Sequence, residues 1–188
     1  MNIKIANQIK LGAFLFIFYQ VLSLNAQQTD AYKKFTDQLK TYETKKFVKK
    51  YKNGKIKEIY SLTYYEYEGV KYSFYSGEYI RYYRNGNKSF ERQQDMFGTP
   101  LIINWYYPNG DLSETSKTIK LDTKAESLYE FLSSDKSILI TSLSEKYLPL
   151  NGSKGKPTLR KKGNYFNNKK IGVWEIYKNG KVIKTKSY

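Results

Sequence analysis

The sequence contains no cysteine and no histidine, and these two absences exclude much of the common chemistry of protein sites. Without cysteine there is no disulfide, no thiolate metal ligand, no thiol nucleophile and no lipobox for a lipid anchor. Without histidine the chain lacks the side chain that most often acts as a general base near neutral pH. No glycine-rich phosphate loop precedes a predicted helix. We therefore predict no catalytic residues, no metal and no cofactor.

Chemistry based on carboxylates alone, as in glycoside hydrolysis, stays open after these exclusions. The acidic side chains show no spacing that singles out a general acid and a base. The candidates considered are Glu66, Glu68, Glu78, Asp95 and Glu114. We interpret them as charges that balance neighbouring lysines, and we expect a protein that is not an enzyme.

Acidic residues are scarce relative to basic ones. The chain has 33 Lys and Arg against 17 Asp and Glu, a formal net charge of +16. Such an excess attracts anionic partners and makes their binding sensitive to salt. Lipid headgroups, acidic polysaccharide and acidic proteins fit this charge, and nucleic acid is disfavoured for an exported chain.

Residues 1–26 have the pattern of a secretory signal peptide. Lys4 and Lys10 form a positive segment, Leu11 to Leu24 is apolar, and Ala26 offers a small residue for cleavage before Gln27. An uncleaved N-terminal anchor is the alternative. Cleavage would leave residues 27–188 without a transmembrane span, in the periplasm or secreted, enough chain for one domain.

A short turn phrase, Tyr-x-Asn-Gly, occurs four times. Asn-Gly is the strongest short signal for a β-hairpin, because a type I′ turn needs two residues that tolerate positive φ. Its glycines are 32, 24 and 70 residues apart, a period near 23 that indicates a repeat array. The residues of the four copies are Tyr51, Asn53 and Gly54; Tyr83, Asn85 and Gly86; Tyr107, Asn109 and Gly110; and Tyr177, Asn179 and Gly180.

Aromatic runs precede three of these turns, and they include Gly77 with Tyr79, then Trp105, and Gly172 with Trp174. Glycine, an aromatic residue, Tyr-x-Asn-Gly and then Lys is similar to the unit of the bacterial MORN-repeat variants of the YwqK-like antitoxin family. The last copy matches best. The resemblance covers residues 46–120 and 163–188, and it implies a β-hairpin array for protein or membrane contacts with no catalytic residues.

The predicted fold class is mainly β, an antiparallel up-and-down meander of MORN-like hairpin repeats. The repeats are expected over 47–121 and again over 163–188. Predicted strands are 47–51, 55–65, 70–75, 78–83, 88–92, 101–107, 112–121, 163–166, 171–177 and 181–187. The chain has twenty Tyr and ten Phe, and most of the Tyr lie in these strands. We interpret these rings as cladding of a partly wet sheet face, with a ligand-stacking platform as the alternative.

Residues 27–46 are predicted to hold an N-terminal helix. Tyr32, Phe35, Leu39 and Tyr42 follow one another at helical spacing, and Thr29 or Asp30 can act as the N-cap. The opposite side is charged. We expect the helix to cover one end of the sheet; a helix lying on a membrane surface is the alternative.

Residues 122–162 interrupt the repeat and are predicted to be a helical and loop insertion. Thr123 and Glu126 form a capping box before a short helix, and 137–150 is either a strand or a second helix. The segment 151–162 is predicted to be a mobile basic loop. The insertion is either a binding element or a decayed repeat. Its candidate contacts for an anionic partner are Lys154, Lys156, Arg160, Lys161 and Lys162.

The function predicted from these features is that of a non-catalytic exported interaction module, a MORN-like scaffold that binds an acidic protein or an anionic envelope surface. An antitoxin-like or immunity-like neutralising protein is the first alternative. A carbohydrate-binding protein is the weaker one.

Overall fold

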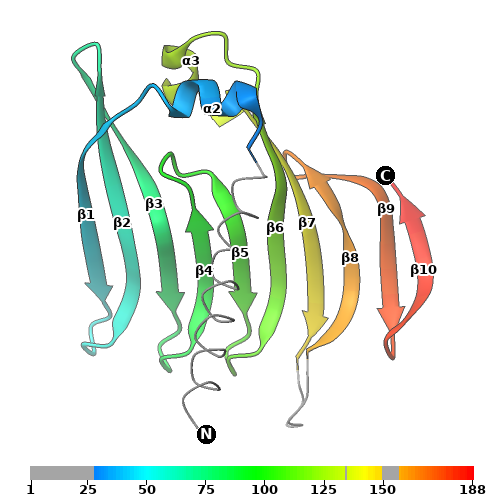
Figure 1. Ribbon diagram of the computed structural model, residues 1–188. Coiled ribbons are helices and arrows are strands. Elements are labelled where there is room, and N and C mark those ends of the chain that lie inside the picture. Colours follow the sequence, from blue (N-terminus) through cyan, green and yellow to red (C-terminus); the bar gives the residue numbers. More distant parts are fainter. Residues whose placement is uncertain (1–27, 134, 150–156) are drawn as a thin grey trace, which may run out of the picture.

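The computed structural model describes residues 28–133, 135–149 and 157–188, and these build one open antiparallel sheet. Its strands lie side by side in chain order, as an up-and-down meander (Figure 1). The strands are β1 (Thr41–Lys50), β2 (Ile56–Tyr67), β3 (Val70–Tyr82), β4 (Lys88–Gln94), β5 (Pro100–Tyr106), β6 (Leu112–Thr123), β7 (Ile138–Leu148), β8 (Thr158–Phe166), β9 (Lys169–Lys178) and β10 (Lys181–Ser187). The predicted fold class is confirmed. The predicted signal peptide, residues 1–26, lies outside the described residues.

Two short helices lie at one end of the sheet, above the loop that joins β4 to β5 (Figure 1). They are α2 (Asp30–Thr36) and α3 (Leu128–Ser133), and a 3-10 turn, η1 (Asp135–Ser137), follows α3. Their apolar side chains meet the sheet in one buried cluster. Its members are Tyr32, Phe35, Leu121, Leu128, Phe131 and Leu132. This helix-end cluster is the nearest thing in the described chain to a conventional two-layer core.

The helix predicted over 27–46 is much shorter than expected. It ends at Thr36, and β1 begins at Thr41, so Tyr42 belongs to a strand and is 51% exposed. The spacing that suggested a longer helix is overridden by pairing, because 41–48 is rich in Thr, Tyr, Phe and Val and lies along the long strand β2. The predicted cap is confirmed: the side chain of Thr29 accepts a hydrogen bond from the N–H of Tyr32.

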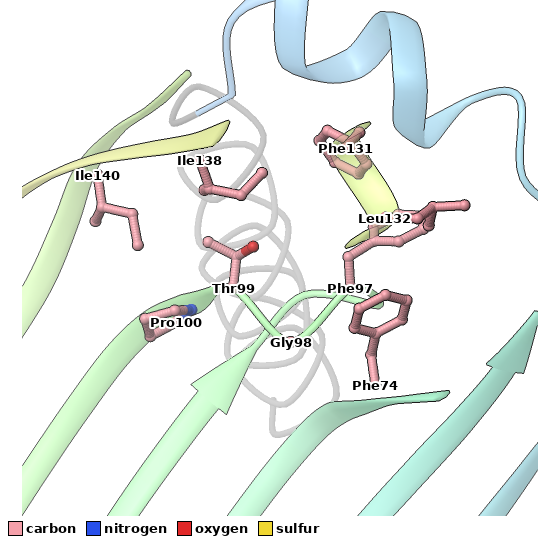
Figure 2. A pocket seen from close by; sticks show the side chains of 9 residues that line it. All are labelled: Phe74, Phe97, Gly98, Thr99, Pro100, Phe131, Leu132, Ile138 and Ile140. Carbon is pink, nitrogen blue, oxygen red and sulfur yellow. The ribbon is translucent and has the colours of Figure 1, made fainter. Parts of the chain in front are cut away.

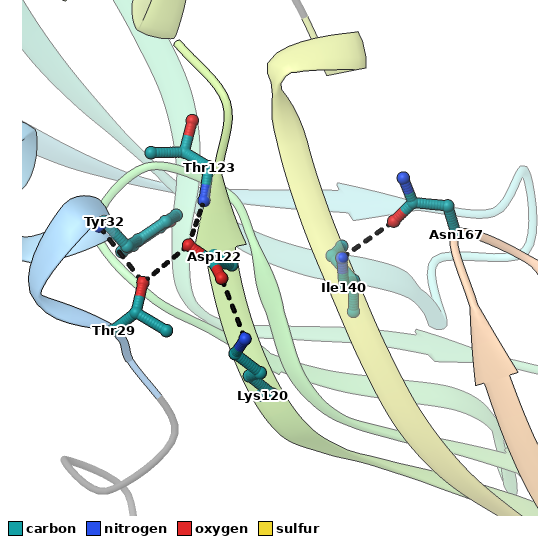
Figure 3. A network of polar contacts seen from close by, with 7 residues as sticks. All are labelled: Thr29, Tyr32, Lys120, Asp122, Thr123, Ile140 and Asn167. Carbon is teal, nitrogen blue, oxygen red and sulfur yellow. Dashed lines mark hydrogen bonds and ion pairs between the residues drawn. The ribbon is translucent and has the colours of Figure 1, made fainter.

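Thr29 also ties α2 to the sheet (Figure 3). Its hydroxyl donates to Asp122 Oδ1 at 2.8 Å, and the same carboxylate accepts the N–H of Thr123 and pairs with Lys120 at 2.9 Å. The backbone repeats the link, because the N–H of Thr29 donates to the carbonyl of Leu121 at 2.9 Å. The start of the helix is therefore fixed to β6 rather than to a sheet edge.

Within its described residues, the segment 122–162 holds the predicted short helix, as α3, but the rest is mainly sheet rather than loop. Helical turns occupy Leu128–Ser133 and Asp135–Ser137, while β7 pairs with β6 on one side and with β8 on the other. The β-branched run that opens β7 at Ile138 explains the outcome, since such side chains favour a pleated, half-buried surface. The meander continues through this region without a break in strand order.

Glycine 77 does not divide two strands, as the sequence pattern suggested. Strand β3 runs through it from Val70 to Tyr82, and the register with β2 shifts between Ile59 and Ser61. Gly77 has φ of 64°, the same value as Gly172 in the last repeat copy. In both copies the motif glycine thus lies in the left-handed region inside a strand, two residues before the motif aromatic, as a β-bulge requires.

Candidate interaction surface

The motif tyrosines connect each hairpin to the next one. The hydroxyl of Tyr51 donates to the carbonyl of Tyr82 at 2.5 Å, and that of Tyr83 donates to the carbonyl of Tyr106 at 2.7 Å. Tyr107 continues the series with a 3.0 Å bond to the carbonyl of Tyr147. We call these three residues the tyrosine staples. Their side chains are committed to the scaffold.

The Asn-Gly pairs form the predicted corners, but three of the four are not type I′ turns. At the first corner the N–H of Gly54 donates to the carbonyl of Tyr51, and Asn53 lacks positive φ. Such a turn is a tight type I turn followed by a left-handed glycine. Asn53 Oδ1 instead accepts the N–H of Lys55 at 3.2 Å. The same arrangement recurs at the next two corners, and only Asn179-Gly180 has positive φ at both residues.

Trp174 is the most buried motif aromatic, at 3% exposure. Its ring lies against Gly163, where a Cβ atom would stand 2.3–2.5 Å from the indole carbons. Its indole N–H donates to the carbonyl of Asn164 at 3.1 Å. Tyr165 packs edge-on against it at 5.0 Å, and Lys170 lies over the ring at 4.7 Å. This tryptophan is therefore part of the packing of β8 against β9.

The other motif aromatics belong to a continuous aromatic ladder across β1 to β5. Neighbouring ring centroids along the ladder lie 5.2–5.8 Å apart, a range typical of stacked or edge-to-face pairs. The ladder residues are Phe47, Tyr60, Tyr75, Tyr79, Phe90 and Trp105. Such cross-strand pairs stabilise a sheet by about 0.2–1 kcal/mol each. The predicted cladding role thus has a structural basis for most of these rings.

Cations lie over the ladder. Arg81 is 4.4 Å from the ring of Phe90, and Arg92 lies 5.5 Å from Tyr79 and 5.9 Å from Tyr75. Burial lowers the pKa of Arg92, whose buried Nε has no hydrogen-bond partner in the described chain. Both arginines contact the rings of the sheet, and the buried Arg92 is poorly placed to meet a partner.

Accessible positive charge lies at both edges of the sheet. At the C-terminal edge (Figure 1) it is carried by what we call the C-terminal basic strands, β8, β9 and β10. Residues 157–188 hold nine Lys and Arg against one acidic residue, Glu175. Every residue of β10 is exposed, including Lys181, Lys184 and Lys186. Within the described residues, Lys162 is the one basic side chain of this group in an ion pair, at 3.0 Å from Glu145.

The end of the predicted basic loop is a strand. Arg160, Lys161 and Lys162 lie on β8, which pairs with β7 from Thr158 to Phe166 and with β9 from Lys161 to Phe166. Arg160 and Lys161 line a shallow cavity of about 260 Å³ together with Lys146 and Tyr107. Lys154 and Lys156 lie outside the described residues. The structure therefore places three of the five predicted contact residues on the C-terminal basic strands.

An apolar pocket of about 230 Å³ opens beside α3 (Figure 2). Its lining residues are Phe74, Phe97, Gly98, Thr99, Pro100, Phe131, Leu132, Ile138 and Ile140. The side chains of Phe97, Phe131 and Leu132 gather on one side of it, and those of Ile138 and Ile140 on the other. The pocket belongs to the seam between the helices and the sheet.

Asp95 holds the β4–β5 loop at this seam. Its carboxylate accepts the hydroxyl of Tyr32 at 2.6 Å and the N–H groups of Phe97 and Thr99, both at 2.9 Å. Burial raises the pKa of Asp95 above its ordinary value, against the opposite effect of these hydrogen bonds. Burial also raises the pKa of Tyr32 strongly. These bonds hold α2 against the β4–β5 loop. The sequence indicated only that Asp95 balances neighbouring lysines, and it did not predict this role.

Comparisons with protein-family models, with curated proteins and with solved structures find no match to this chain. The resemblance to MORN-repeat variants therefore stays a prediction. None of the helices in the described part of the chain is both long and apolar enough to cross a membrane. Over the same residues, Asp and Glu side chains form no group of three or more that could hold a metal ion.

Proposed function

We propose that this chain is an exported, non-catalytic interaction module, in which a MORN-like β-repeat sheet presents its C-terminal basic strands to an acidic protein or an anionic envelope surface. The observation that carries the proposal is the charge of residues 157–188, nine basic residues against one acid, on strands that end in the fully exposed β10. Tyr51, Tyr83 and Trp174 support it indirectly, because their polar groups bond to the scaffold and leave recognition to other side chains.

The charge is distributed in a way that favours a surface partner over a small ligand. Lys181, Lys184 and Lys186 stand along one edge strand with no acid among them, and Arg160 and Lys161 lie two strands further in. Lysine side chains on an exposed strand are mobile point charges, suited to many phosphate or carboxylate groups at once. Potentials of this kind raise the rate of encounter with an anionic surface and weaken as salt is added.

The test compares two triple variants that remove the same charge from opposite ends of the sheet. One carries Lys181→Gln, Lys184→Gln and Lys186→Gln on β10. Its control carries the same change at three exposed lysines near β1, which are Lys46, Lys50 and Lys55. Binding is measured by co-sedimentation with phosphatidylglycerol vesicles and by affinity capture from envelope extracts, both over a range of salt.

A lysine near an anionic membrane contributes about 1 kcal/mol, so the β10 variant is expected to bind vesicles about 100-fold more weakly. The β1 control should stay within a few-fold of the wild type. Equal losses in the two variants, or no salt dependence, would contradict a role for the C-terminal basic strands. Capture of one stoichiometric protein that needs β10 would identify the acidic-protein form of the proposal.

A further inference from the structure

The two tryptophans of the chain are placed in opposite ways, and the difference points to a second site. Trp174 is buried and its indole N–H is bonded to Asn164. Trp105 is half-buried, its indole N–H has no partner within the described residues, and its ring lines a cavity of about 240 Å³ on the sheet. The edge-to-face contact with Phe90, at 5.8 Å, holds the Trp105 ring in place.

The cavity lies over β6 and β7, between an aromatic wall on β5 and another on β8. Trp105 forms the first wall and Tyr165 the second. Tyr165 is fixed in turn by its edge-to-face contact with Trp174, at 5.0 Å and 82°. The register brings the intervening positions into line, because Ile103 pairs with Ser116, and Thr118 with Ser142.

The floor of the cavity is polar, small and incompletely hydrogen-bonded. Ser116, Thr118 and Ser142 form it, and among them only Thr118 has a partner in the described chain, the carbonyl of Pro100 at 2.6 Å. The hydroxyls of Ser116, Ser142 and Tyr165 are without a partner there. These hydroxyls are therefore open to hydrogen bonds from a molecule that enters the cavity.

Two more polar groups complete the lining. Glu114 holds its carboxylate at the rim through bonds from Ser144 at 2.9 Å and Lys146 at 2.8 Å. Asn168 reaches the cavity from the β8–β9 turn, which is fastened to β7 because Ile140 N–H donates to Asn167 Oδ1 at 2.7 Å (Figure 3). No Lys or Arg is among the lining residues, so the cavity offers an anion no counter-charge.

We infer that this cavity is a binding site for a neutral saccharide unit. A sugar ring has apolar C–H faces for the two aromatic walls and a rim of hydroxyls that both donate and accept. Those hydroxyls match the indole N–H, the serine hydroxyls, the Asn168 amide and the Glu114 carboxylate. A purely apolar ligand would leave these groups unpaired, which is costly in a desolvated site. The inference is independent of the C-terminal basic strands, whose partner is anionic.

The test is calorimetric titration of the purified protein with neutral tetrasaccharides, cellotetraose and chitotetraose, in parallel with fluorescence and with adenine as a non-sugar comparison. We expect saturable sugar binding that is unchanged by salt and that weakens by about tenfold or more in Trp105→Ala. Tyr75→Ala is the matched control, an aromatic truncation on the same ladder outside the cavity.

Ser116→Gln provides a second variant in case Trp105→Ala disturbs folding. It fills the cavity while keeping Trp105 as a reporter, and it should abolish both the heat and the fluorescence change. Failure of both tetrasaccharides to bind, binding unaffected by either cavity variant, or tighter binding of adenine would overturn the inference. The β10 triple variant should bind sugar like the wild type, which separates this result from the test of the proposed function.

Discussion

Among the described glycines, Gly163 has the least space for an added methyl group. It has no positive φ, so an alanine is allowed by the backbone, but its Cβ would lie 2.3–2.5 Å from the Trp174 ring. Over-packing of this kind typically costs about 1–3 kcal/mol, because the ring or the strand must move. Gly163→Ala should therefore lower the free energy of unfolding by about that amount, as measured by urea denaturation.

A double-mutant cycle makes this prediction specific. In a Trp174→Leu background the Gly163→Ala change should cost much less, because the ring that it strikes is gone. Ser187→Ala on exposed β10 should be near neutral. An equal cost of Gly163→Ala in both backgrounds would show that the contact with Trp174 is not the cause.

Asp95 and Asp122 should respond to pH in opposite directions. Burial raises the pKa of Asp95, so the folded protein holds this proton more tightly than the unfolded chain, and stability falls as the carboxyl ionises with rising pH. The hydrogen bond from Lys120 lowers the pKa of Asp122. The carboxylate therefore stabilises the fold at pH values above the ordinary pKa of Asp, and this stabilisation is lost as the pH falls.

Two isosteric variants test these signs by urea denaturation between about pH 3 and pH 7. The free energy of unfolding of Asp95→Asn, relative to that of the wild type, should be highest at neutral pH and should fall in acid. Asp122→Asn should cost most at neutral pH and least in acid. The same pH trend in both variants would contradict the assignment for Asp95.

At the scale of the element, the tyrosine staples add links that a β-hairpin does not make alone. Removing one hydroxyl while keeping the ring should cost about 1 kcal/mol, the usual net contribution of such a hydrogen bond. Tyr83→Phe and Tyr107→Phe are the test variants, and thermal or urea unfolding is the measurement. Tyr42→Phe is the control, because Tyr42 is exposed and its hydroxyl has no partner in the described chain. If the two variants lose no more stability than the control, the tyrosine staples do not stabilise the sheet.

Turn chemistry made the β-hairpins predictable from sequence. All four Asn-Gly corners and the Asn167-Asn168 turn lie where the pattern placed them, because each needs at least one residue with positive φ, which glycine and asparagine tolerate. Spacing alone was less reliable. The helical spacing that runs on to Tyr42 is overridden by pairing with β2, and the strand end predicted at Gly77 is a bulge inside β3.

The candidate sites were less predictable, because they depend on residues far apart in the chain. The excess of basic residues near Arg160 was visible, but not that these residues would stand on β8 beside the exposed β10. The cavity between Trp105 and Tyr165 joins four strands through their register, which local patterns do not report. A half-buried Trp and a buried one cannot be told apart from their flanking residues.

At the scale of the whole molecule, the sheet is a linear array in which each strand contacts mainly its sequence neighbours. Local stability should follow position in such an array. By hydrogen exchange with mass spectrometry we expect β10 to exchange early, since it is exposed throughout and pairs with one strand only. Strand β6 should exchange late, because it pairs on both sides and holds the fully buried Leu121 beneath α2. Uniform exchange across the sheet would indicate a single cooperative unit instead.

The staples also set a direction for mechanical failure. Tyr51, Tyr83 and Tyr107 each reach forward to a later hairpin, the last of them to β7. The tyrosine of the last copy, Tyr177, donates instead to Glu175 within its own strand. A pull on the C-terminus would thus open β10 first and then load the packing of Trp174 between β8 and β9, before it reaches the first tyrosine staple at β7. A protein held by its C-terminus would therefore unfold from β10 inward and keep the strands joined by the tyrosine staples, β1 to β7, folded.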